Sequence, residues 1–283
     1  MNIVVAVPLS FDLTEFTEFL WLHRVPHRVV EQGEQQIVVV ADNVDSVQLR
    51  DIFEQWRHGS ALSDFSVARS AGRRQSVTAA MAGSWLTLTL IVASIGLSML
   101  IGFGSNLELL VWFTILNPYQ YGADTTALPA VFDAVSAEPW RVISPIFLHF
   151  SIAHLAFNLL WMWIVARRIE MHRGAFFISA LVIISGVVSN IAQFIDGGPL
   201  FGGMSGVVYA VIGYAWWFDR QQPVPRYGVS QGLMVFMLVW LALGYTDVLS
   251  AIGFGSIANT AHLAGLVAGV LFGTCQSVLG RRQ

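Results

Sequence analysis

The stretch Gly202-Gly203-Met204-Ser205-Gly206 decides how the rest of this sequence is interpreted, because it sets a serine among glycines beside a long apolar run. A helix-breaking Asp-Gly-Gly-Pro at residues 196–199 precedes it, and the apolar residues 207–218 follow it. Glycine lets the backbone turn sharply, and the N–H groups that begin a helix can face a developing anion. The pattern therefore indicates a serine nucleophile at the start of a helix. Taken alone, however, it favours a Gly/Ser notch at which membrane helices pack.

The composition indicates that most of the chain lies in a membrane. Its 283 residues are 55% apolar and only 12% charged, and the mean hydropathy is +0.63, well above the norm for soluble proteins. Residues 1–75 hold seven arginines and ten acidic residues, whereas residues 76–283 hold eight of each. We therefore expect a soluble head joined to a polytopic membrane body. No basic stripe indicates a nucleic-acid partner.

The head is predicted to be a small cytoplasmic α/β domain over residues 1–60, followed by a polar linker over residues 61–78. Runs of β-branched residues predict strands, and apolar residues at helical spacing predict helices. The expected order is β-α-β-β-α, with strands at residues 2–7, 28–31 and 35–41 and helices at residues 11–23 and 43–56. Asp42 or Asn43 is expected to cap the second helix.

The body, residues 79–283, is predicted to form a bundle of six transmembrane helices. Its apolar segments cover residues 81–103, 145–166, 174–194, 205–218, 232–244 and 256–279. The fourth and fifth are shorter than the roughly 20 residues that a full span needs. Residues 200–204 should therefore enter as non-helical backbone that is packed in protein or lines a cavity. The apolar loop at residues 104–144 is expected to form a partly embedded hairpin in the outer interface.

Arginine placement predicts the orientation, because loops rich in Lys and Arg stay in the cytoplasm. Arginines flank alternate ends of the segments, and Arg141 is the only basic residue on the opposite side. We therefore expect both chain ends in the cytoplasm and Ser205 near the outer face. The arginines on the expected cytoplasmic side are Arg69, Arg73, Arg74, Arg167, Arg168, Arg173, Arg220, Arg226, Arg281 and Arg282.

The last segment supplies a partner for the serine. His262 and the glycines Gly265, Gly269 and Gly273 share one helical face, and such glycines let another helix approach closely. An ionisable residue inside a membrane helix is functional by default, and histidine is the commonest general base. Packing of the two small-faced helices would bring His262 to the Ser205 hydroxyl and form a Ser–His dyad. The alternative is a histidine that only hydrogen-bonds between helices.

Three further side chains are expected to support this dyad. Tyr209, one turn after Ser205, could stack on the His262 ring. His154 and Asn158 lie at i and i+4 in the second segment, and both can donate to an oxyanion beside the Ser205 N–H. The alternative for His154 and Asn158 is interhelical hydrogen bonding alone.

The remaining histidines and a row of polar residues raise the questions of a metal site and of a path for water. His149, His154 and His262 could ligate zinc, but His149 and His154 are five residues apart and fall on different helical faces. We therefore predict no metal and no other cofactor.

Ser185, Ser189 and Gln193 form a polar row in the third segment that should point inward. We expect this row to line a hydrated path to Ser205, with Gln193 at its mouth, although hydrogen bonding alone would also explain it.

Four motifs carry a resemblance to a known family. They are Gly203-Met204-Ser205-Gly206, Ala261-His262-x-x-Gly265, His154-x-x-x-Asn158 and Trp140-Arg141. Together they resemble the rhomboid intramembrane serine proteases, specifically the bacterial type that carries a small α/β head before six membrane segments. The similarity extends over essentially the whole chain.

The resemblance implies hydrolysis of peptide bonds in or near transmembrane segments of membrane proteins, in the bacterial inner membrane, at a site that opens toward the periplasm. It implies Ser205 as nucleophile, His262 as base, and His154, Asn158 and the Ser205 N–H as oxyanion hole. Tyr209 matches the family's stacking tyrosine, and Trp140 and Arg141 match its structural loop. Glu170 resembles a position that ties helices together.

Two other functions remained as alternatives. A non-catalytic rhomboid-like protein that binds and delivers membrane proteins would need Ser205 or His262 replaced, and both are present. A transporter with a broken helix would need inverted repeats and midplane ion ligands, and neither is found in the sequence.

Overall fold

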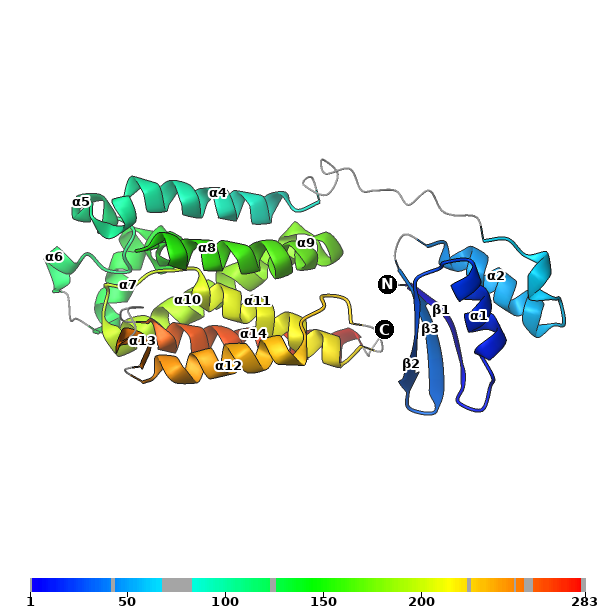
Figure 1. Ribbon diagram of the computed structural model, residues 1–283. Helices are drawn as coiled ribbons and strands as arrows, with labels where there is room; N and C mark the ends of the chain where they lie inside the picture. Colours follow the sequence, from blue (N-terminus) through cyan, green and yellow to red (C-terminus); the bar gives the residue numbers. More distant parts are fainter. Residues whose placement is uncertain are drawn as a thin grey trace. The chain divides into compact units, whose positions relative to one another are not determined.

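The computed structural model describes residues 2–41, 44–67, 83–122, 126–222, 225–246, 248–251 and 257–280. The chain divides into two compact units, the first formed chiefly by residues 1–78 and the second by the helical remainder (Figure 1). Most of the predicted linker, residues 68–78, lies outside the described residues, and residues 62–64 form a short 3-10 helix, η1 (Leu62–Asp64).

The first unit has the predicted β-α-β-β-α order. Among its described residues, three strands form an antiparallel sheet in the order β1-β3-β2, with Val29 of β2 paired to Val38 of β3. The elements are β1 (Asn2–Pro8), α1 (Thr14–Leu22), β2 (His27–Gln32), β3 (Gln35–Val40) and α2 (Ser46–Arg57).

The central strand and the two helices enclose the core of this unit. The last four residues of β3 are buried, and the Phe16 and Phe53 rings pack edge to face at 5.0 Å, a favourable aromatic geometry. Asp42 and Asn43, the predicted caps of the second helix, lie outside the described residues. Instead, the Asp45 carboxylate accepts from the Val47 and Gln48 N–H groups, and the helix begins later than predicted.

The second unit is built from long helices that run along a common direction (Figure 1). Each predicted apolar segment coincides with one of them. They are α4 (Trp85–Leu100), the continuous run α8 (Ile152–Trp161), η5 (Met162–Ala166, π-helical) and α9 (Arg167–Arg173), then α10 (Ala175–Gly197), α11 (Ser205–Arg220), α12 (Gln231–Gly244) and α14 (Asn259–Gly280).

Two boundaries in this unit differ from the sequence-based expectation. The helix of the second segment begins at Ile152, not at residue 145, because the Ser151 hydroxyl caps it by accepting from the His154 N–H. The loop before it is a series of short helices and not a single hairpin. These are η2 (Gly102–Gly104), α5 (Leu107–Leu110), α6 (Pro118–Tyr121), α7 (Leu128–Ala137), η3 (Pro139–Val142) and η4 (Ser144–Phe147), and α13 (Val248–Ala251) follows α12.

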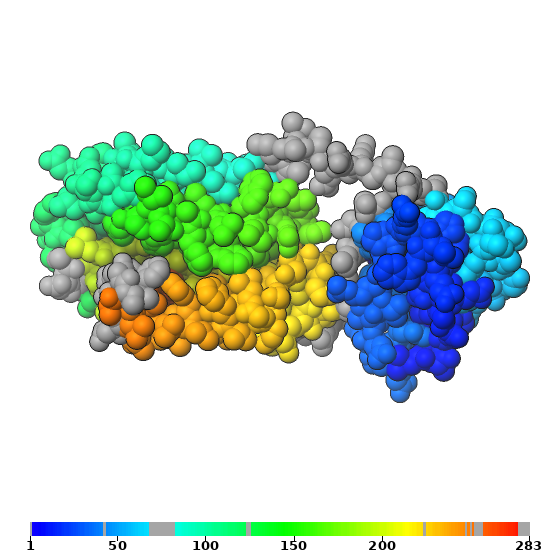
Figure 2. Space-filling view, viewed as in Figure 1, coloured from blue at the N-terminus to red at the C-terminus, as the bar shows by residue number. Residues whose placement is uncertain are grey.

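Helix α11 forms the centre of the second unit. Its residues from Val207 to Ala215 are buried, including Val211 and Ala215 at 0% exposure, and α8 and α12 cover much of it on the face shown in Figure 2. A helix that is apolar on every side and buried is surrounded by other helices. A helix enclosed in this way need not reach both surfaces of the unit, so α11 can be shorter than a full membrane span.

Two helical runs in the described part of the chain are long and apolar enough to cross a membrane. They cover Ile152–Arg173, with 22 residues, and Ala175–Gly197, with 23 residues.

Glu170, which is 2% exposed, joins α9 to the beginning of α4. Its carboxylate accepts from the Leu86 N–H at 2.9 Å, and from the Thr87 N–H at 2.8 Å and hydroxyl at 2.6 Å. A carboxylate at a helix N-terminus satisfies otherwise unpaired N–H groups.

Candidate active site

The glycine-rich stretch reaches α11 as non-helical backbone packed against the segment before α8. The Gly203 N–H donates to the Pro145 carbonyl at 3.0 Å. A Cβ added to Gly202 would lie 2.5 Å from the Leu148 Cβ, so only glycine permits this approach. The loop therefore sets Ser205, the first residue of α11, beside the residues that lead into α8.

Ser205 and His262 form the predicted contact. The Ser205 Oγ lies 2.7 Å from the His262 Nε2, and His262 is 5% exposed. The glycines of α14 account for the short distance between the helices, because a Cβ on Gly265 or Gly269 would collide with the Gly206 or Ala210 carbonyl of α11. Close backbone approach of this kind is the property that small residues give to helix pairs.

The His262 ring is held on one face by Tyr209. The two rings stack with centroids 4.8 Å apart and an interplanar angle of 19°. The Tyr209 hydroxyl donates to the Met237 carbonyl of α12 at 3.0 Å. The His262 Nδ1 has no hydrogen-bond partner among the described residues. The contacts seen here are therefore those of a dyad whose ring orientation comes from stacking.

The start of α14 is anchored to the end of α10. The Gln193 Oε1 accepts from the Ala261 N–H at 3.1 Å, and the Thr260 hydroxyl donates to the Asp196 carboxylate at 2.7 Å. Ser185, Ser189 and Gln193 are buried at 0%, 1% and 8% exposure, so the polar row faces inward. The sequence did not indicate that Gln193 would bind the backbone next to His262.

His154 and Asn158 both project from α8 toward the serine loop. A Cβ on Gly203 would lie 2.5 Å from the His154 Cε1, so the imidazole faces the α-carbon two residues before Ser205. The Asn158 side chain is 1% exposed, and its Nδ2 lies 3.1 Å from the His149 Nε2. Both predicted donors therefore belong to the same neighbourhood as the dyad.

His149 has a place in this site that sequence reasoning missed. It was considered only as a metal ligand, whereas its Nε2 lies within hydrogen-bond distance of both Asn158 and the Met204 N–H. Its ring packs against His154 with centroids 5.0 Å apart. Within the described ranges, no group of three or more His, Cys, Asp or Glu side chains is arranged to hold a metal ion.

Trp140 and Arg141 brace the short helices beside the site. The Arg141 guanidinium, 4% exposed, donates to the Val111 carbonyl at 2.7 Å and the Thr114 carbonyl at 2.9 Å, and it pairs with Glu138. The Trp140 indole donates to the Trp112 carbonyl at 3.2 Å. Both side chains therefore tie backbone carbonyls of this loop together and contribute no group to the dyad.

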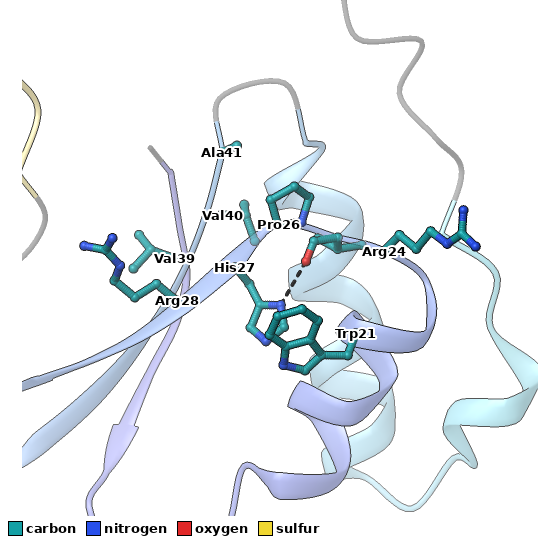
Figure 3. Close-up of a pocket in the computed structure, with 9 residues that line it drawn as sticks. Trp21, Arg24, Pro26, His27, Arg28, Val39, Val40 and Ala41 are labelled. Carbon is teal, nitrogen blue, oxygen red and sulfur yellow. Dashed lines mark hydrogen bonds between the residues drawn. The ribbon is translucent and has the colours of Figure 1, made fainter.

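A separate open pocket lies in the first unit (Figure 3), lined by residues of α1, β2 and β3. The Trp21 and His27 rings meet edge to face at 5.3 Å, and the His27 Nδ1 is bonded to the Val25 carbonyl. The Arg24 and Arg28 side chains point in opposite directions (Figure 3). Because its polar groups diverge, this pocket presents no arrangement comparable to Ser205 and His262.

The second unit therefore sets a serine hydroxyl within hydrogen-bond distance of a histidine imidazole inside an apolar helical bundle, which is the arrangement that activation of a serine nucleophile needs. Comparison with known families agrees with this class. The rhomboid domain family matches residues 136–278, and the rhomboid N-terminal domain family matches residues 1–65. The chain belongs to the rhomboid family.

Three curated relatives named rhomboid protease GlpG illustrate the similarity. The chain is 37% identical to that of Photorhabdus laumondii over 187 residues, 46% identical to that of Serratia proteamaculans over 132 residues, and 34% identical to that of Klebsiella pneumoniae over 201 residues. These alignments cover 66%, 47% and 71% of this chain. They span 59%, 46% and 65% of the relatives' own lengths.

Proposed function

We propose that this protein is an intramembrane serine endopeptidase that cleaves peptide bonds in or near transmembrane segments of membrane proteins. The observation that carries the proposal is the 2.7 Å contact between the Ser205 hydroxyl and the His262 imidazole at the start of a buried helix. The names of the relatives, rhomboid protease GlpG, support the same activity. The partners are transmembrane substrates and the lipid bilayer, and the reaction uses no cofactor.

The geometry supports a two-stage hydrolysis. The Ser205 Oγ attacks the carbonyl carbon of the substrate while its proton passes to the His262 Nε2. The oxyanion faces the Ser205 N–H, His154 and Asn158. His262 then returns the proton to the leaving amine as the C–N bond breaks and leaves an acyl ester on Ser205. Water attacks this ester with His262 again as base, which releases the carboxylic acid and restores the serine.

The proposed topology has six spans, with both chain ends in the cytoplasm of a bacterium and the site open toward the periplasm. Six long helical runs among the described residues support it. The placement of Arg167, Arg168, Arg173, Arg220 and Arg226 at the ends of segments opposite the acidic loops supports it as well. Of the arginines on which the expectation rests, Arg69, Arg73, Arg74, Arg281 and Arg282 lie outside the described residues. The domains in this proposal remain residues 1–60, 61–78 and 79–283.

Substitution of the dyad tests the activity. Ser205→Ala and His262→Ala should each abolish cleavage of a fluorogenic transmembrane substrate by the full-length protein in detergent. The double variant should be no slower than either single variant, because the two groups act as a unit. Labelling by a fluorophosphonate should disappear in Ser205→Ala. Ser136→Ala is the control that should leave labelling intact, because the Ser136 side chain is exposed and its hydroxyl donates to the Phe132 carbonyl within the same short helix.

Two outcomes would contradict this assignment. Substantial turnover in Ser205→Ala would exclude this serine as the nucleophile. A wild-type protein that binds transmembrane segments but neither cleaves them nor reacts with the fluorophosphonate would be a binding and delivery protein.

A further inference from the structure

His149 is a fully buried histidine outside the dyad, and its surroundings indicate which of its two ring nitrogens carries the proton. It is 0% exposed. Its Nδ1 lies 3.2 Å from the Phe147 carbonyl oxygen and 3.3 Å from the Ser98 Oγ of α4. Because a carbonyl oxygen can only accept, Nδ1 carries the proton in the neutral ring. The Nε2 of His149 is therefore an acceptor.

Two donors meet this acceptor. The Asn158 Nδ2 lies 3.1 Å from the His149 Nε2, and the Met204 N–H lies 3.4 Å from it. Since both donors share one acceptor, the Asn158 amide lies beside the backbone that leads directly into Ser205. His149 thereby joins α8 to the serine loop.

The orientation of the Asn158 amide depends on His149. Its Oδ1 is buried and has no hydrogen-bond partner among the described residues. An unpaired buried carbonyl is unfavourable, so the amide would gain by turning if the nitrogen were not held. One N–H of Nδ2 is taken by His149, and the other remains for a ligand of the site.

We propose that His149 is a positioning residue of the oxyanion hole. Its Nε2 fixes the Asn158 amide with the nitrogen toward the site, and it holds the Met204 N–H so that the neighbouring Ser205 N–H keeps its direction. The proposal rests on the proposed protease function, because an oxyanion forms only if Ser205 attacks a carbonyl. It also explains why a histidine with no role in proton transfer is buried beside the dyad.

A matched pair of variants tests the role of the Nε2 atom. The amide of Gln reaches the level of Nε2 and can present a carbonyl acceptor there, whereas the shorter Asn reaches only the level of Nδ1. His149→Asn should lower kcat by about 10- to 100-fold with little change in KM, because the loss of a whole oxyanion donor costs about 100- to 1000-fold. His149→Gln should stay within about threefold of wild type. Melting temperatures of the two variants should be similar.

The decisive comparison is the effect of His149→Asn in the wild-type protein and in a protein that already carries Asn158→Ala. Because His149 acts through Asn158 as well as through the Met204 N–H, His149→Asn should lower kcat by a clearly smaller factor once Asn158 is already alanine. Equal losses in both backgrounds, or equal kcat for His149→Gln and His149→Asn, would overturn the proposal. A wild-type protein without cleavage activity would instead overturn the proposed function.

A spectroscopic measurement on the wild-type protein tests directly which nitrogen of the His149 ring carries the proton. Nitrogen-15 spectra of histidine-labelled full-length protein, assigned by loss of the signal in His149→Gln, report which ring nitrogen carries the proton. If that variant does not fold, hydrogen-bond couplings to the Asn158 amide provide the assignment. A neutral ring with Nδ1 protonated supports the proposal, and a protonated Nε2 on His149 overturns it.

Discussion

Gly203 has a backbone φ of +127°, and its α-carbon faces the His154 ring. Side chains of L-residues rarely adopt that conformation, and an added Cβ would lie 2.5 Å from the His154 Cε1. Two independent constraints, backbone conformation and contact, therefore require glycine at this position. The glycine that makes the sequence motif recognisable is also the residue against which the proposed oxyanion donor packs.

Gly203→Ala should reduce kcat by about 100-fold and destabilise the fold by about 1–3 kcal/mol, because backbone strain and a displaced His154 act together. The matched control is Gly174→Ala, where φ is +84° but nothing lies within 4 Å of the added Cβ. That control should lose stability and keep kcat, as measured by thermal unfolding and substrate cleavage. Equal kcat in the two variants would contradict the contact with His154.

At the level of the helices, the position of His262 depends on how α14 is held. Gly265 and Gly269 let α14 approach the α11 backbone, and Gln193 and Asp196 at the end of α10 bind the first turn of α14. The Gln193 amide oxygen satisfies an N–H that the helix cannot pair by itself. Gln193 and Asp196 at the end of α10 therefore position the proposed base.

Replacing Gln193 separates these contributions. Gln193→Met keeps the length of the side chain but removes the acceptor, so it should lower stability by about 1 kcal/mol, as loss of a helix cap does, and slow both acylation and deacylation. Gln193→Glu keeps an acceptor at the positive end of the helix dipole and should retain more of both properties. Thermal unfolding and pre-steady-state cleavage check this. Wild-type stability and rates in Gln193→Met would show that the α14 contact is dispensable.

At the level of the whole molecule, the two units have separate hydrophobic cores. The core of the first unit includes Phe16, Leu49 and Phe53, and that of the second includes Val208, Ile212 and Tyr214. Each residue of the proposed site belongs to the second unit. The contacts described above for the site are therefore all made within the second unit.

Removal of residues 1–67 should leave kcat/KM for a transmembrane substrate within about threefold of the full-length value, a difference below about 1 kcal/mol. The isolated first unit should unfold cooperatively, since it contains a complete core and a paired sheet. Cleavage assays and circular dichroism on the two fragments measure these properties. A tenfold fall in kcat/KM of a well-folded helical fragment would show that the first unit acts on the site.

Much of the fold could be predicted from local patterns in the sequence. The apolar segments predicted each long helix, because helix formation in an apolar environment depends on short-range hydrogen bonds and on a continuous run of suitable side chains. The Ser205 and His262 motifs predicted a contact between two helices, because each helix has a face of small residues and such faces can pack closely together. The predicted starts of helices were less accurate where a single capping side chain sets the first residue, as Ser151 does for α8 and Asp45 does for α2.

By itself, the sequence determined the apolar helices, the α/β head and the pairing of Ser205 with His262, because each follows from residue spacing along one or two elements. Only the tertiary structure decided the roles of His149 and Gln193. His149 meets Asn158, Met204 and Ser98 from three separate segments, and Gln193 meets the backbone of Ala261 across 68 positions of chain. A hydrogen bond depends on distances of a few tenths of an ångström and on ring tautomers, and residue spacing within one helix specifies neither.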